Sequence, residues 1–404
     1  MRRFNRSFSP RPPSRHVWSL TAIWLGLMLG GLGNAADFSQ AQGLLDAYAE
    51  RADRAAVAAA VVHGDALLWS GATGTANKEL GIAADDDTVF LVASISKTVT
   101  ATSVMQLVED GQLDLDKDVN TYLPFALRNP KQPGAVITLR HLLAHTSGLS
   151  DIYWDSVFSD LTTEEGDPEL SLADFCRAFL TLGGTFYYPA TFTTTPPGTA
   201  FGYSNLGYAL VGCIVENVAG KPFDDFTKQR IFTPLGMTRT SWRVADFQDE
   251  DMAMSYGHYG EVYGNYTLSA YPVGGLRTTV KDLSRFLRAF MLGGTLEGQT
   301  ILQPASVREM RRLQYQDVAD AAPQALGWIE MDFAEEESSR TFLGHSGGSN
   351  GVSTLMAYDP AAKTGAIIFT NGDFSNGQGQ DELVELFQTL VNEGDEQVDR
   401  GSSR

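Results

Sequence analysis

The chain has 404 residues, of which 43% are hydrophobic and 20% charged, so it can bury a sizeable core and is not globally disordered. Its net charge is −19, from 30 basic and 49 acidic residues. Such an acidic surface repels phosphate backbones, so we expect no nucleic-acid partner.

The first 35 residues are typical of an export signal. They contain five arginines and no acidic residue, and the apolar run from Val17 to Gly33 is followed by small residues up to Ala36. We therefore predict a signal peptide over residues 1–35, cleaved near Ala35, and a periplasmic or secreted mature protein without stable membrane insertion. The apolar run is at the short limit for crossing a bilayer, so an uncleaved anchor is the alternative.

The mature region begins with a helical pattern over residues 38–56. Two apolar runs, 57–62 and 66–71, flank His63-Gly64-Asp65, and this arrangement predicts a β-hairpin. A helix is expected from Ser94 to Glu109. Helices between long loops follow.

The chain returns to strand patterns near its end. These cover residues 326–331, 352–358 and 365–370, and a closing helix is expected over 381–391. Strands at both ends with helices between them predict one sheet built from distant segments, with an inserted helical region. We therefore expect one domain over residues 36–394, with its sheet from about 36–90 and 300–394 and its helical part from about 91–299. Residues 395–404 are expected to form a flexible tail.

Two aromatic-rich loops, 186–192 and 256–271, interrupt the helical region; they either line a cleft or cover the core.

The two cysteines, Cys176 and Cys213, lie in apolar stretches, which favours buried thiols, although export permits a disulfide. The chain has six scattered histidines and no HExxH or CxxC pattern. We therefore expect neither a metal nor another cofactor.

The clearest chemical signal is Ser94-Ile95-Ser96-Lys97, which opens a predicted helix. Residues three apart share a helix face, so the Ser94 hydroxyl and the Lys97 amine can meet. The helix dipole favours negative charge that develops at this end. Burial lowers the pKa of a lysine, and its neutral amine can then take the serine proton. SxxK is common by chance, however, and needs support from other segments.

A second motif, Tyr203-Ser204-Asn205, precedes an apolar helix pattern over residues 206–218. An ordinary helix cap is the alternative interpretation. Tyr263-Gly264-Asn265 has the same YxN spacing, but only the Tyr203 copy follows a Pro196-Pro197-Gly198 segment.

The third motif is Gly344-His345-Ser346-Gly347-Gly348. It also fits the GxSxG nucleophile elbow, which makes Ser346 a rival nucleophile. That elbow needs a helix after the serine and a histidine further downstream. Here strand residues follow, and His345 is the last histidine of the chain. We therefore expect Ser346 not to be the nucleophile.

In this order, the three motifs resemble those of the penicillin-recognising serine hydrolases, which include class C β-lactamases, D,D-peptidases, D-aminopeptidases and esterases. Connecting segments agree, namely Leu142–Leu149 (LLAHTSGL), Pro234–Met237 (PLGM) and Gly274–Leu276 (GGL). The resemblance covers roughly residues 40–393. It implies a β-lactamase/transpeptidase-like α/β (α+β) fold with an antiparallel sheet from both chain ends.

The resemblance also implies a mechanism. Ser94 would form an acyl-enzyme, with Lys97 and Tyr203 sharing the proton transfers. The backbone N–H groups of Ser94 and Gly348 would form an oxyanion hole, and Asn205 would hold either the substrate amide or Lys97. The substrate-binding residues implied are Asn205, His345, Ser346, Gly347 and Gly348. His141 and His145 are expected to brace a helix end and a turn.

One departure bears on the substrate. Typical class C β-lactamases have Lys-Thr-Gly where this chain has His345-Ser346-Gly347. A histidine is mostly neutral at pH 7, so the fixed positive charge that meets a β-lactam carboxylate is missing. We therefore favour a peptidase or esterase acting on D-amino-acid peptides or small esters. The alternatives are a class C-type β-lactamase and a catalytically weak envelope binding or scaffold protein.

Overall fold

A computed structural model describes residues 38–50, 56–164, 166–258, 260–318, 323–333, 340–372 and 377–402. The predicted signal peptide lies outside these ranges. Within them, no helix is both long and apolar enough to cross a membrane.

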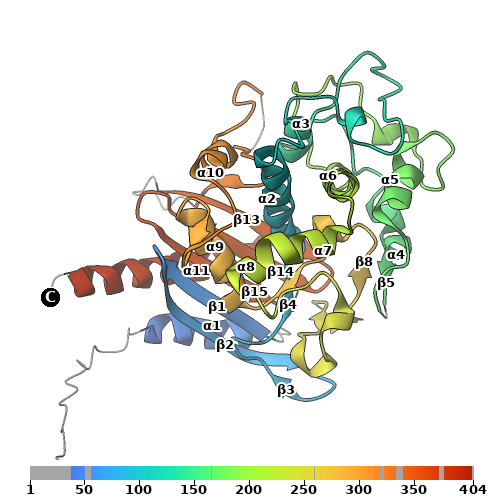
Figure 1. The fold of residues 1–404 in the computed structure, drawn as a ribbon. Helices are drawn as coiled ribbons and strands as arrows, with labels where there is room; N and C mark the ends of the chain where they lie inside the picture. Colours follow the sequence, from blue (N-terminus) through green and yellow to red (C-terminus); the bar gives the residue numbers. More distant parts are fainter. Residues whose placement is uncertain are drawn as a thin grey trace, which may run out of the picture. The chain divides into compact units, whose positions relative to one another are not determined.

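A seven-stranded antiparallel sheet forms the centre of the fold. Its strands are β1 (Ala56–His63), β2 (Ala66–Asn77), β3 (Ile82–Ala83), β12 (Ile329–Asp332), β13 (Thr341–Ser349), β14 (Val352–Tyr358) and β15 (Thr364–Thr370), in the order β12-β13-β14-β15-β1-β2-β3. β1 and β15 pair from Val57 opposite Thr370 to His63 opposite Thr364. Figure 1 shows the blue N-terminal strands beside the red C-terminal ones. The predicted sheet from both chain ends is confirmed.

Helices cover both faces of this sheet. The outer face carries α1 (Ser39–Glu50) and α11 (Gly377–Ser402), and the inner face carries α2 (Ser96–Glu109) and α9 (Val280–Met291). In β1, Ala58 and Ala60 pack into the inner cluster, whereas Val57 and Ala59 pack against α1 and α11. Because both faces are buried at the centre of the sheet, β1 and β15 read as largely apolar runs rather than as alternating patterns.

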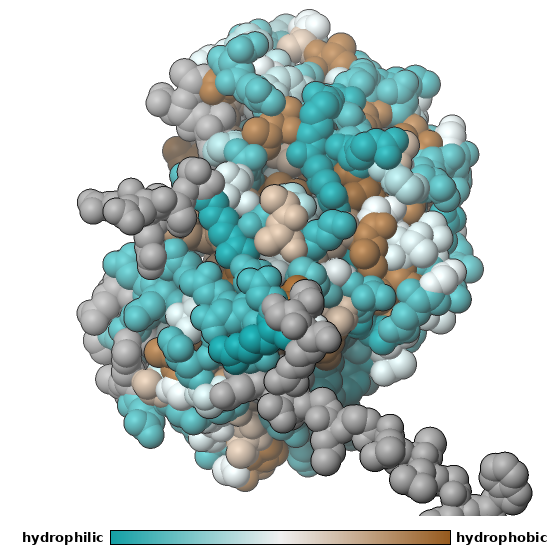
Figure 2. Space-filling view, turned by 90° about the vertical axis from the view of Figure 1, so that its left-hand side faces the viewer, coloured by the Kyte–Doolittle hydropathy of each residue, from teal (hydrophilic) through white to brown (hydrophobic). Residues whose placement is uncertain are grey.

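The inserted region lies beyond α2, on the side away from α1 and α11 (Figure 1). Its helices, together with one that leads back to the sheet, are α3 (Leu139–Leu143), α4 (Phe158–Leu161), α5 (Leu172–Leu180), α6 (Asn205–Ala219), α7 (Phe223–Thr227), α8 (Thr233–Leu235) and α10 (Pro304–Arg311). Short strands join its loops in pairs: β4 (Phe90–Leu91), β5 (Thr162–Thr163), β6 (Ser255–Tyr256), β7 (Val262–Gly264), β8 (Thr267–Leu268), β9 (Arg277–Thr278), β10 (Thr295–Leu296) and β11 (Gln299–Thr300). Figure 2 shows a face on which hydrophilic side chains dominate and hydrophobic ones form small separate groups.

Two elements differ from the sequence-based expectations. The tail predicted to be flexible from residue 395 is helical as far as Ser402, because α11 continues. The ion pair of Arg340 with Asp395, at 2.8 Å, ties this part of the helix to the start of β13. β13 itself was not predicted as a strand, since Gly344, Gly347 and Gly348 lower its β-propensity.

The cysteines agree with the expectation of buried free thiols. Cys176 on α5 and Cys213 on α6 are both buried and unbridged. Burial raises the pKa of the Cys176 thiol, so it stays protonated at neutral pH.

Candidate active site

Ser94 lies in a single 3₁₀ turn, Ala93–Ile95, directly before α2, and Lys97 lies in the first turn of α2. Lys97 Nζ is 3.0 Å from Ser94 Oγ, as the spacing of three residues predicts. Ala93 has φ 46°, a left-handed conformation that is uncommon outside glycine. Backbone strain of this kind concentrates at functional sites.

Lys97 is completely buried, and its amine lies at the meeting point of three segments. Nζ donates to Asn205 Oδ1 at 2.8 Å and to the backbone oxygen of Val273 at 2.7 Å, and Ser94 Oγ is its third polar neighbour. Asn205 therefore holds Lys97, one of its two expected roles. Burial lowers the pKa of Lys97 to about 7, and the nearby charge of Asp151 opposes this effect. The contact with Val273 was missed by sequence analysis; its one signal is the Gly274–Leu276 segment that follows it.

Tyr203 approaches Ser94 from the start of α6. Its hydroxyl group donates to Ser94 Oγ at 2.9 Å, and its ring centre lies 5.0 Å from Lys97 Nζ. Burial raises the pKa of the Tyr203 phenol above its ordinary value, although 37% of the residue's surface is exposed, so it is protonated at neutral pH. Ser204 also caps α6, accepting from Gly207 N–H at 3.0 Å. The motif thus serves as a helix cap and also brings Tyr203 and Asn205 to Ser94 and Lys97.

β13 borders the other side of Ser94. A Cβ atom on Gly347 would lie 3.1 Å from Ser94 N and 2.4 Å from the backbone oxygen of Val92, so only glycine fits there without a shift. A Cβ atom on Gly348 would meet nothing within 4 Å. The joint oxyanion hole of the Ser94 and Gly348 N–H groups stays a prediction.

His345 is buried on β13, with its ring centre 6.5 Å from that of Tyr203. Its Nδ1 lies 2.6 Å from the backbone oxygen of Ser346, a geometry that requires an N–H on Nδ1. Burial, and secondarily the charge of Lys97, lower the pKa of His345 to about 3. The ring is therefore neutral at pH 7. This agrees with the expectation that the histidine does not replace the charge of the lysine that typical class C enzymes have here.

Ser346 does not occupy a nucleophile elbow. It is an exposed residue inside β13, paired opposite Leu355 of β14. After β13 the chain continues into the strand β14 rather than into a helix. Ser346 remains a predicted substrate-binding residue on the open side of the strand.

The two other histidines of the sequence analysis lie where bracing roles were expected. His141 Nδ1 accepts the backbone N–H of Thr138 at 3.1 Å and so caps α3. His145 Nδ1 accepts the backbone N–H of Ser204 at 3.0 Å. Asp151, which the sequence analysis missed, lies beside the same segment and accepts from Ser204 Oγ at 3.1 Å.

The aromatic loops have different roles. In the first, Phe192 is buried and Tyr187 packs against the main core, so this loop mainly covers the core. In the second, Tyr263 and Tyr266 line a cavity of about 450 Å³ together with Phe158. The Tyr266 hydroxyl donates to Ser349 Oγ at 2.6 Å, next to Gly348 on β13. This cavity therefore adjoins the strand that borders Ser94.

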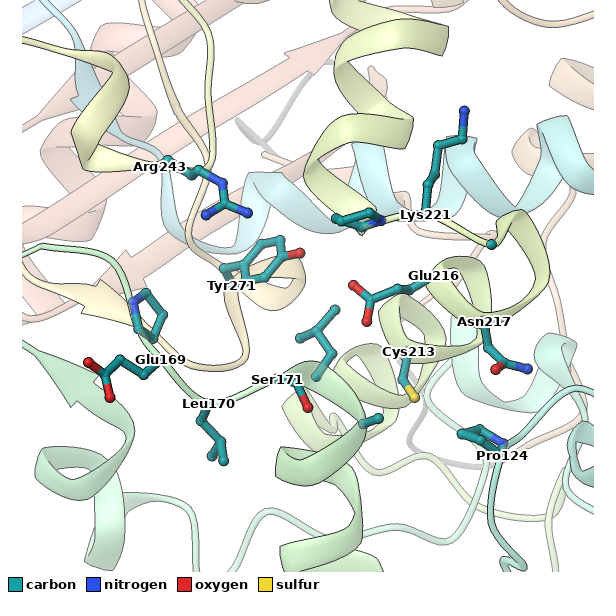
Figure 3. Close-up of a pocket in the computed structure, with 15 residues that line it drawn as sticks. Pro124, Glu169, Leu170, Ser171, Cys213, Glu216, Asn217, Lys221, Arg243 and Tyr271 are labelled. Carbon is teal, nitrogen blue, oxygen red and sulfur yellow. The ribbon is translucent and has the colours of Figure 1, made fainter.

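A second cavity, of about 520 Å³, lies at the opposite end of α6 (Figure 3). Glu216, Tyr271 and Arg243 point into it. Arg243 pairs with Asp224, and Glu216 accepts the backbone N–H of Phe223 at 3.2 Å. In the part of the chain that the structure describes, no group of three or more His, Cys, Asp or Glu residues could hold a metal ion.

Comparison with known proteins identifies the family. A family model described as Beta-lactamase matches residues 41–390. The chain belongs to the Beta-lactamase family. This is a family of serine hydrolases, and the cluster of Ser94, Lys97 and Tyr203 lies inside the matched range.

Two relatives illustrate the range of the Beta-lactamase family. Penicillin-binding protein 4 of Amycolatopsis lactamdurans is 30% identical over 346 residues, covering 83% of this chain and 85% of the relative. The D-alanyl-D-alanine-carboxypeptidase/endopeptidase AmpH of Escherichia coli is 27% identical over 295 residues, covering 70% of each chain.

Solved structures agree on the fold. A D-amino acid amidase from Ochrobactrum anthropi SV3, complexed with L-phenylalanine amide, matches with a TM-score of 0.70 and 24% identity, covering 88% of this chain and 98% of that one. A class C beta lactamase from Rhodobacter sphaeroides matches with a TM-score of 0.63 and 20% identity, covering 87% and 98%. The β-lactamase/transpeptidase-like fold is confirmed.

Proposed function

We propose that the protein is a peptidase or esterase that works through an acyl-enzyme on Ser94 and acts on D-amino-acid peptides or small esters. One observation carries the mechanism: Ser94 Oγ lies within hydrogen-bond reach of both Lys97 Nζ, at 3.0 Å, and the Tyr203 hydroxyl, at 2.9 Å. A serine hydroxyl needs such a neighbouring base to become a nucleophile at neutral pH.

The hydrogen bonds of Lys97 favour it as this base. A neutral amine has two N–H groups and one lone pair. Asn205 Oδ1 and the Val273 carbonyl oxygen can only accept, so they occupy both N–H groups and leave the lone pair for the Ser94 hydroxyl. A pKa of about 7 makes the neutral form available at physiological pH.

The reaction then has two halves. Ser94 Oγ forms a bond to the carbonyl carbon of the substrate while its proton passes to Lys97. The bond from that carbon to the leaving nitrogen or oxygen breaks as Tyr203, which is protonated at neutral pH, gives its proton to the leaving atom and takes back the proton held by Lys97. Water next attacks the ester carbon, releases the acid and restores the Ser94 hydroxyl.

The surroundings of Ser94 support the substrate class. His345 is neutral because burial lowers its pKa to about 3, so it supplies no fixed cation for a β-lactam carboxylate. The cavity beside β13 has a mixed lining, with the rings of Phe158, Tyr263 and Tyr266 beside the polar groups of Glu164 and Asn350, and offers room for a peptide side chain. The name of one relative, a D-alanyl-D-alanine-carboxypeptidase/endopeptidase, agrees with a peptide substrate.

We also propose that the enzyme acts in the periplasm or outside the cell, because the pattern of residues 1–35 is typical of an export signal.

The test is labelling with a serine-directed fluorophosphonate, followed by intact mass and peptide mapping. We expect a single adduct on Ser94, and then turnover of D-amino-acid peptides or esters in preference to β-lactams. An adduct on Ser346 would overturn the mechanism. Folded protein without any adduct would favour the envelope binding protein, whereas faster turnover of β-lactams than of peptides and esters would favour a β-lactamase.

A further inference from the structure

His145 contacts the segment that carries Tyr203 in three ways. Its Nδ1 accepts the Ser204 backbone N–H at 3.0 Å, and its carbonyl oxygen accepts the Gly202 N–H at 2.8 Å. Its ring stacks on the Tyr203 ring with the centres 4.2 Å apart. The residue is 2% exposed and has φ 55°, so surrounding contacts hold it in an uncommon backbone conformation.

Asp151 anchors the next part of the same segment. Its carboxylate accepts from Ser204 Oγ and from the Leu206 backbone N–H, both at 3.1 Å, and from the Asn205 backbone N–H. Backbone N–H groups at a helix start lack partners within the helix and favour a negative charge there. The carboxylate thus fixes the first turn of α6, from which the Asn205 side chain reaches Lys97.

Tyr203 and Asn205 therefore lie between two buried anchors. We propose that His145 and Asp151 are positioning residues, which hold the Tyr203 hydroxyl on Ser94 and the Asn205 amide oxygen on Lys97. This inference rests on the proposed function, because it assigns the two residues a role in the acylation of Ser94. Neither residue is proposed to react; both act through the geometry of the Tyr203–Asn205 segment.

Asp151 also differs from His145 in its charge. The described titratable groups around Lys97 are Asp151, the phenols of Tyr203 and Tyr208, and the imidazoles of His145 and His345. Burial keeps the phenols and imidazoles neutral. Burial also raises the pKa of Asp151, but the hydrogen bonds that its carboxylate accepts and the charge of Lys97 favour its ionised form, and this anion favours the protonated form of Lys97. Without this carboxylate, burial acts unopposed and the pKa of Lys97 falls below about 7.

The Asp151→Asn variant separates this role from a purely structural one. We expect the rate of Ser94 acylation by the fluorophosphonate to fall about a hundredfold, the loss typical of a misplaced catalytic group. The acid limb of its pH profile should move to lower pH. The pKa of Lys97, followed through the ¹³Cε resonance in lysine-labelled protein, should fall in the same variant, and this second readout does not require turnover.

A second variant tests the other anchor and guards against misfolding of the first. His145→Phe keeps an aromatic ring beside Tyr203 but removes the acceptor for the Ser204 N–H, so kcat should fall while KM changes by less than about threefold. Ser171→Ala is the control: it removes the side chain that caps α5, where Ser171 Oγ accepts the Asp174 N–H at 3.1 Å. It should lower thermal stability without changing the acylation rate.

Wild-type acylation rates in both Asp151→Asn and His145→Phe would overturn the proposal, as would an unchanged pKa of Lys97 in Asp151→Asn. Failure of the wild-type protein to label on Ser94 would instead refute the proposed function. The resonance of Lys97 would then still show whether Asp151 sets the charge of that lysine.

Discussion

Asn205 Oδ1 accepts a hydrogen bond from Lys97 Nζ at 2.8 Å, although 108 residues separate the two along the chain. This contact joins the start of α6 to the start of α2, and both helix starts face β13 through Tyr203, Ser94 and their neighbours. The site is therefore a product of how the inserted helical region packs against the sheet. Substitutions in the inserted helical region and substitutions on β13 should therefore both change the rate of Ser94 acylation.

Replacing the proposed nucleophile should separate it from its rival. Ser94→Ala should reduce hydrolysis to background without unfolding the protein, because one half-buried hydroxyl is lost and no cavity larger than an oxygen atom forms. Ser346→Ala should keep substantial activity. Steady-state rates, with circular dichroism as the check on folding, decide between the two. Wild-type turnover by Ser94→Ala would refute the assignment.

Lys97→Ala should abolish acylation, because an unassisted serine hydroxyl is a poor nucleophile at neutral pH. We expect a loss of about 10³-fold or more, a size typical of removing a general base together with its positioning contacts. Burst-phase kinetics with an activated ester measure acylation separately from later steps. An undiminished burst rate would remove the lysine from the mechanism.

The pH dependence of acylation should follow the charge of Lys97. Its pKa is lowered to about 7, so the amine is protonated and inactive below this pH and neutral and active above it. The rate should therefore rise with pH through a midpoint near 7. His345, with a pKa lowered to about 3, should not titrate in this range. A flat profile between pH 5 and pH 8 in stable protein would argue against Lys97 as the base.

Gly347 and Gly348 provide a matched pair of substitutions on β13. In Gly347→Ala the new Cβ would lie 2.3 Å from Thr354 Oγ1 and 2.4 Å from the Val92 carbonyl oxygen, so β13 must move away from the turn that carries Ser94. We expect loss of acylation and a cost of about 1–3 kcal/mol, as for other overpacked sites. Gly348→Ala meets no atom within 4 Å and should keep wild-type thermal stability. Equal melting temperatures for both variants would contradict this account.

Trp328 provides a test of the core rather than of the site. It is completely buried, and its ring stacks on Phe290 of α9 with the centres 4.0 Å apart. Trp328→Ala should lower the free energy of unfolding by about 3–5 kcal/mol, whereas Leu182→Ala, at a side chain 88% exposed, should change it by less than about 0.5 kcal/mol. Urea titrations measure both, and a similar effect in the two variants would be unexpected.

The sequence was sufficient to predict those contacts and strands that depend on one short segment of the chain. The spacing of Ser94 and Lys97 implied their contact, and the apolar runs of β1, β14 and β15 implied a sheet made from both ends of the chain. The ordered motifs then pointed to the family. β13 was not recognised as a strand, because its three glycines lack β-propensity; of these, Gly347 is required by the close approach of Ser94 and Val92.

The sequence by itself thus indicated the contact of Ser94 with Lys97, because residue spacing is a local property, and the resemblance of its ordered motifs to a known family implied the fold and the role of Tyr203. Only the tertiary structure decided which groups surround the amine of Lys97. The Val273 carbonyl oxygen accepts from the amine, and the Asp151 carboxylate acts on it through its charge. Both come from segments far from Lys97 in sequence, and a local pattern such as Gly274–Leu276 does not specify which distant group its segment meets. The lowered pKa of Lys97 has the same origin, because it arises from burial by several elements at once.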